Sequence, residues 1–169
     1  MNRTMKVMFT ATLACAGLLT TVNAKAQSDA DKKFLAMAAQ SDQNEIALSK
    51  LAADKTTNPD VKAFAEKMVT EHQQMTESMK PFADKWGLTA PSGPDADHKK
   101  EWDKLNGMSG NAFDKEYMSQ MMTDHTKAYS AFTKEGEDTK DPEFKAAVLK
   151  GKTAVAAHKN MAYDLKKKL

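Results

Sequence analysis

The spacing of apolar residues between Asn58 and Gly87 restricts the fold of this chain more than any other feature. Apolar residues recur there at steps of mostly three and four, which is the period of an amphipathic helix with one buried face. The helix begins at Asn58-Pro59-Asp60, which combines an N-cap side chain, a proline at the first helical position and an acid in the first turn. Gly87 ends it, and Leu88 can fold back over the last turn as in a Schellman motif. The buried stripe comprises Val61, Phe64, Ala65, Met68, His72, Met75, Met79, Phe82 and Trp86.

Three further segments have the same period, and none shows the alternation typical of a strand. The first helix is predicted from residue 28 or 29 to about 56, the third from 111 to 136, and the fourth from 141 to 169. Between the second and third, a stretch rich in proline and glycine leads to a short helix at about 96–105. Tight turns make the first and second helices antiparallel, and likewise the third and fourth. The sequence therefore predicts an all-α, antiparallel ferritin-like four-helix bundle with a long crossover that contains a short helix.

The first 26 residues have the pattern of a cleaved signal peptide. A basic start precedes a short apolar run at residues 7–19, and Ala24-Lys25-Ala26 provides the small residues of a cleavage site. We expect residues 27–169 to form one exported domain, most simply in a bacterial periplasm. Cys15, the only cysteine, lies inside the apolar run. The run continues beyond it, so lipidation is not favoured, and the mature chain would have no thiolate ligand and no disulfide.

The charge of the mature chain is close to balanced. The full sequence has 25 basic and 23 acidic residues, and removal of Arg3, Lys6 and Lys25 with the signal peptide leaves 22 basic residues. This balance predicts neither a nucleic-acid partner nor an anionic membrane surface. No segment of the mature chain approaches the ~20 consecutive apolar residues of a transmembrane helix. Haem-attachment and nucleotide-binding motifs are also absent from the sequence.

Each of the four long predicted helices has a stripe of apolar residues, and in each stripe an ionisable side chain takes the place of an apolar one. A carboxylate and two or three imidazoles on facing helices are suitable ligands for one divalent ion, namely Zn, Fe, Mn or Cu. A Cu(I) site would also accept the methionines that flank His72 and His125, although methionine commonly fills helical cores. The predicted metal ligands are Glu45, His72, His125 and His158, with Asp114 as a weaker candidate.

Residue counts predict how high each ligand lies in the bundle. At ~1.5 Å per residue from the turn of its own hairpin, three candidates lie at roughly 15–18 Å and His158 at ~24 Å. Glu45, His72 and His125 are therefore expected to share a layer, with His158 ~9 Å deeper. Asp114 lies about 16 Å along the helix from His125. Its position also fits the acid of a capping box that begins at Asn111.

A second interpretation needs no metal ion. Glu45 would accept hydrogen bonds from His72 or His125 in a buried network that fixes the helix register. The protein would then be a non-catalytic component of the cell envelope that acts through its surface. His98, in the short polar helix, is expected to be solvated. The sequence identifies no reaction, no protein partner and no oligomeric state, so an enzymatic role stays undecided.

Several segments resemble the bacterial "domain of unknown function 4142" family over nearly the whole mature chain. They include Asn44-Glu45-Ile46, the segment 58–65 with His72, Phe113-Asp114 with Asp124-His125, and Ala157-His158. The resemblance implies an exported ferritin-like bundle. It implies no particular activity, because the family has no settled one. Ferritin-like di-iron proteins use Glu-x-x-His on two helices, whereas here the residues three before His72, His125 and His158 are Val69, Met122 and Val155. The resemblance therefore favours a single metal ion over a di-iron centre.

Overall fold

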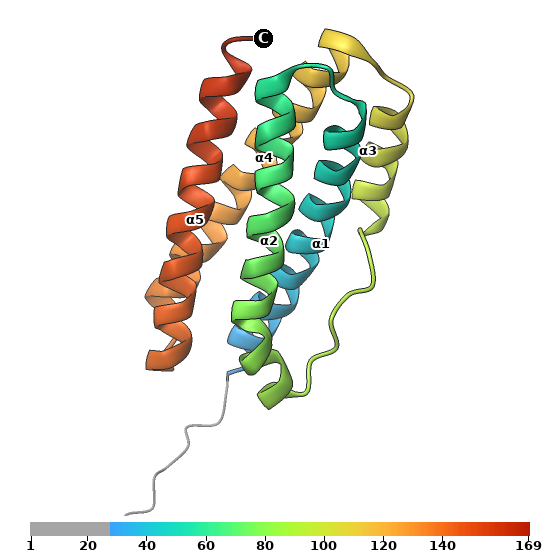
Figure 1. The fold of residues 1–169 in the computed structure, drawn as a ribbon. Helices are drawn as coiled ribbons and strands as arrows, with labels where there is room; N and C mark the ends of the chain where they lie inside the picture. Colours follow the sequence, from blue (N-terminus) through green and yellow to red (C-terminus); the bar gives the residue numbers. More distant parts are fainter. Residues whose placement is uncertain (1–27) are drawn as a thin grey trace, which may run out of the picture.

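The computed structural model describes residues 28–169, which form five helices and no strand. α1 (Asp29–Lys55) and α2 (Pro59–Trp86) form one antiparallel hairpin, and α4 (Gly110–Asp138) and α5 (Pro142–Lys166) form a second. α3 (Ala96–Asn106) lies in the crossover between them (Figure 1). The predicted all-α bundle is therefore confirmed. The predicted signal peptide, with Cys15, lies outside the described residues.

The crossover sets the direction of the second hairpin. The α1–α2 turn lies at the top of the bundle in Figure 1, and the α4–α5 turn lies at the bottom. We call these the upper and lower ends. α2 and α4 both descend from the upper end, while α1 and α5 both rise toward it. Within the described part of the chain, no helix is both long and apolar enough to span a membrane.

Capping side chains define the helix ends that the sequence predicts. Asn58 accepts hydrogen bonds from the backbone N–H groups of Asp60 and Val61 at 3.0 and 3.3 Å, and Asp141 caps α5 in the same way. Gly87 has φ 69°, and the N–H of Leu88 donates to the carbonyl of Ala83 at 2.9 Å. α2 therefore ends in the predicted Schellman motif.

The apolar core is divided into two clusters by a polar layer. On each of the four long helices, the members of the two clusters lie on either side of a buried ionisable residue. The upper cluster includes Leu48, Val61, Phe64, Met68, Leu105, Phe113, Tyr117, Met118, Met121, Ala162 and Leu165. The lower cluster includes Phe34, Leu35, Ala38, Met79, Phe132, Phe144, Val148 and Val155.

Candidate metal centre

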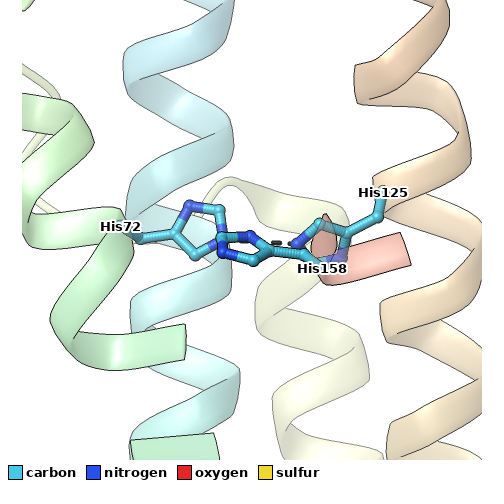
Figure 2. A group of neighbouring side chains, drawn as sticks. All are labelled: His72, His125 and His158. Carbon is cyan, nitrogen blue, oxygen red and sulfur yellow. Dashed lines mark hydrogen bonds between the residues drawn. The ribbon is translucent and has the colours of Figure 1, made fainter. Parts of the chain in front are cut away.

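Three histidines from three helices meet in the polar layer. His72 from α2, His125 from α4 and His158 from α5 point toward one another (Figure 2). Their ring centroids are 5.2–5.5 Å apart, and one ring nitrogen of each lies within 4.8 Å of the other two. Their exposed fractions are 3%, 1% and 0%, so bulk water does not solvate these nitrogens. We call these three residues the histidine cluster.

The hydrogen-bond partner of each ring determines which nitrogen is left for a ligand. Nδ1 of His125 is 2.8 Å from the carbonyl oxygen of Met121, and because a carbonyl only accepts, this nitrogen carries the proton. Nδ1 of His72 donates to the Asp42 carboxylate at 2.8 Å, and the Thr76 hydroxyl donates to the other oxygen of Asp42 at 3.1 Å. In a neutral ring whose Nδ1 carries the proton, Nε2 keeps its lone pair.

In His158 the roles of the two ring nitrogens are reversed, so that Nε2 donates a hydrogen bond and Nδ1 keeps the lone pair. Its Nε2 donates to the carboxylate of Glu71 at 2.6 Å, while its buried Nδ1 has no hydrogen-bond partner in the described structure. A buried polar atom without a partner costs roughly 1–3 kcal/mol. His158 thus has a lone pair that no protein group satisfies, as a metal ligand would have.

The contact between His72 and His125 also fits a shared ion. Their Nε2 atoms are 3.3 Å apart, along the dashed line in Figure 2. Two lone pairs at this distance repel each other unless a proton or a cation lies between them. Two imidazole nitrogens bound to one tetrahedral ion at 2.0–2.1 Å are themselves about 3.3 Å apart. The separation therefore matches the edge of a tetrahedral coordination sphere.

The surroundings keep two of these rings neutral. The pKa of His125 falls to about 3, mainly because burial disfavours the charged ring and also because His72 and His158 lie close by. Burial likewise lowers the pKa of His158 to about 4, and the nearby His72 adds to the effect. Neutral imidazole is the form that binds metal ions, so both rings are in the binding form at neutral pH.

Glu45 lies beside the histidine cluster and is not one of its members. Its Oε1 is 3.9 Å from Nδ1 of His125, the nitrogen that already donates to the Met121 carbonyl. Among residues 28–169, its buried Oε2 has no hydrogen-bond partner. Burial raises the pKa of this carboxyl well above its usual range, and the charges of Asp124 and Asp42 raise it further. Burial and these neighbouring charges therefore favour the protonated form of this side chain.

The prediction that His158 lies ~9 Å below the other ligands is wrong. Heights counted from the turn of each hairpin are not comparable, because the two turns lie at opposite ends of the bundle. Counted from the lower end, His72 and His125 lie 14 and 13 residues before their helices end, and His158 lies 16 residues after α5 begins. A difference of three residues is about 4.5 Å, which side chains can span.

Asp114 is not in this layer. Its carboxylate accepts a hydrogen bond from the Thr56 hydroxyl at 2.6 Å, at the upper end of the bundle. The N-cap of α4 is Ser109 instead of Asn111, so the predicted capping box is also wrong. At the lower end, Thr139 donates in the same way to Asp31 at 3.2 Å. Asp114 therefore has a structural role, because it ties one hairpin to the turn of the other.

Three residues that matter here are absent from the predicted site. Asp42 and Glu71 hold the histidine cluster, and a weak signal for both exists, since each has the spacing of its helix's buried stripe. Asp42 follows Ala38 by four residues, and Glu71 follows Met68 by three. The third, His98, was expected to be solvated, but it lies between the carboxylates of two aspartates.

Comparisons with known proteins agree with this fold. The family model described as "Domain of unknown function (DUF4142)" matches residues 17–165. No curated protein matches the chain. A DUF305 fragment from Deinococcus radiodurans is 11% identical with a TM-score of 0.74, over 85% of this chain and 99% of that one.

Two further solved structures are similar. CopM in its Cu(I)-bound form is 20% identical with a TM-score of 0.69, over 82% of this chain and 96% of that one. A DUF305 protein from Streptomyces coelicolor is 18% identical with a TM-score of 0.69, over 80% of this chain and 89% of that one. At these identities the likeness concerns the fold alone.

Proposed function

The chain belongs to the DUF4142 family, whose description assigns no activity, and we propose that it is an exported protein that binds one transition-metal ion in the histidine cluster. His72, His125 and His158 would hold the ion through Nε2, Nε2 and Nδ1. The signal-peptide pattern at residues 1–26 supports export. Since a bound ion would link α2 to α4 and α5, metal binding would also join the two hairpins.

The unpartnered Nδ1 of His158 is the observation that carries this proposal. A hydrogen-bond network that only fixed the helix register would satisfy its own buried atoms, because each unsatisfied one destabilises the fold. Within the described part of the chain, Nδ1 of His158 and Oε2 of Glu45 both lack partners, while the other nitrogen of each ring forms a hydrogen bond with an oxygen. Imidazole ligands of metal ions are typically oriented in this way.

Copper is the ion that we favour. Imidazole nitrogens suit zinc, copper, iron and nickel alike, so the ligands alone do not choose among them. CopM, which has the same fold, is known in Cu(I)-, Ag- and Cu(II)-bound forms. Glu45 is the candidate for a fourth ligand, and as a carboxylate it would neutralise part of the charge of the ion.

Metal titration of the chelator-treated protein tests this proposal. We expect one Cu(II) ion, and more weakly one Zn(II) ion, to bind per chain by calorimetry and elemental analysis. His72→Ala, His125→Ala and His158→Ala should each abolish this binding, and Glu45→Gln should weaken it by ~10–100-fold. His98→Ala is the matched control, because His98 lies outside the cluster, and it should bind like the wild type. Wild-type protein that takes up no ion would disprove the proposal.

A further inference from the structure

The three oxygens that hold the histidine cluster differ in their exposure to solvent. The acceptor for His125 is a backbone carbonyl of the fully buried Met121. The Asp42 side chain, which holds His72, is 7% exposed, whereas the Glu71 side chain, which holds His158, is 32% exposed. Of these three contacts, the one between Glu71 and His158 is therefore the closest to solvent.

A groove between α2 and α5 leads to this contact. It encloses about 620 Å³ and is lined by Glu71 together with Met75 and Met161. Half of the α5 side of the groove is formed by the small residues Gly151, Ala154 and Ala157, and the other half by Lys150, Thr153 and Met161. Carboxylate and thioether groups both bind copper ions, so the groove presents suitable ligands outside the centre.

A second cavity lies on the Asp42 side of the cluster. It encloses about 370 Å³ and reaches Asp42 between α1 and α2. The Asp42 carboxylate is buried, and both of its oxygens are engaged, one by His72 and one by Thr76. In contrast, Glu71 is held on its outer side by Lys67, a side chain that is 44% exposed. The Glu71 side can therefore open with less loss of buried hydrogen bonding.

We propose that metal ions reach the histidine cluster through the α2–α5 groove and that Glu71 controls this access. This inference rests on the proposed function. The carboxylate attracts the incoming cation in the groove, and as it turns away from His158 the ring becomes accessible. Lys67 opposes this step, because it engages the same carboxylate at 2.5 Å and repels cations.

Rates of metal uptake test the role of Glu71, with Cu(II) as the probe in rapid-mixing experiments. Glu71→Gln keeps an oxygen acceptor for His158 but removes the charge, and it should lower the association rate constant by about tenfold or more. Lys67→Met should raise this rate constant by ~3–10-fold. Glu66→Gln is the matched control, because Glu66 is exposed on α2 away from the groove lining, and it should leave the rate unchanged.

The rate constants distinguish a role of Glu71 in metal access from a role in orienting the His158 ring only. If Glu71 only orients His158, Glu71→Gln speeds dissociation and leaves association unchanged, and this result would overturn the proposal. Glu71→Asp keeps the charge and provides a second variant, which should load faster than Glu71→Gln. Equal association rates for wild type, Glu71→Gln and Glu71→Asp also reject the access role. Each of these rejections leaves the metal centre intact, whereas failure of the wild type to bind any ion rejects the centre itself.

Discussion

His98 lies between two carboxylates and fixes the crossover to the bundle. Its Nδ1 is 2.8 Å from Asp95 and its Nε2 is 3.4 Å from Asp124. Asp95 also accepts a hydrogen bond from the Asn44 side chain at 2.8 Å, which joins the start of α3 to α1. The pKa of His98 is raised to about 9, mainly by the hydrogen bond with Asp124 and also by Asp95, against the opposing effect of burial.

The raised pKa of His98 predicts a pH-dependent contribution to stability. Because the folded-state pKa exceeds the ordinary value of 6.5, the stabilisation is complete below about pH 6.5 and is lost as the pH rises through about 9. We expect His98→Gln to lower the free energy of unfolding by roughly 1–3 kcal/mol at pH 6 and by much less at pH 10. Urea unfolding of both proteins at the two pH values measures this. An equal loss at both would show that the charge of His98 contributes nothing.

At the scale of helices, the packing of α4 against α5 depends on Gly151. A Cβ atom at this position would lie 2.4 Å from the Phe132 ring. That ring is 3% exposed and packs edge-to-face against Phe34 at 4.9 Å, so it has little room to move. Gly151 thus allows a close approach of the two helices just below the histidine cluster.

Two alanine substitutions distinguish packing from helix propensity. Gly151→Ala should lower the free energy of unfolding by about 1 kcal/mol, because overpacking at 1–3 kcal/mol exceeds the gain in propensity of up to ~1 kcal/mol. Gly136→Ala is the matched variant, since the one close contact of its Cβ, at 2.9 Å, would be with the tip of Leu149, which is 44% exposed. It should be neutral or stabilising in the same denaturant titration. If Gly151→Ala instead stabilises the protein, α4 and α5 move apart readily enough to accommodate the added methyl group.

At the scale of the whole molecule, the histidine cluster lies between the two apolar clusters. One of its members comes from the first hairpin and two come from the second. An ion bound there joins the hairpins in the native state only, because unfolding separates the three rings. Metal binding should therefore stabilise the entire bundle and not only one helix.

Thermal unfolding measures this coupling. With free metal at 100 times Kd, mass action adds about 2.7 kcal/mol. For a domain of this size, such a gain corresponds to a rise in Tm of roughly 8 °C. Chelation should reverse the rise, and His158→Ala should show none. If neither metal nor chelator changes the Tm, this result would support the interpretation in which the polar layer only fixes the register of the helices.

The sequence by itself determined the helices and the two antiparallel hairpins, because both depend on local chemistry. Asn58, Asp141 and Gly87 specify helix ends through bonds to neighbouring residues, and periodicity identifies the buried faces. The resemblance to the DUF4142 family also follows from local segments. His72, His125 and His158 were recognisable as candidates because each interrupts an apolar stripe.

Only the tertiary structure decided which of these residues meet. The relative height of residues on different helices depends on the crossover, which places the two hairpin turns at opposite ends and brings His158 level with His72 and His125. The same packing leaves Glu45 beside the cluster and makes Glu71 its contact with solvent. Helix periodicity gives a side chain's direction around its own axis, and it carries no information on the axial position of another helix.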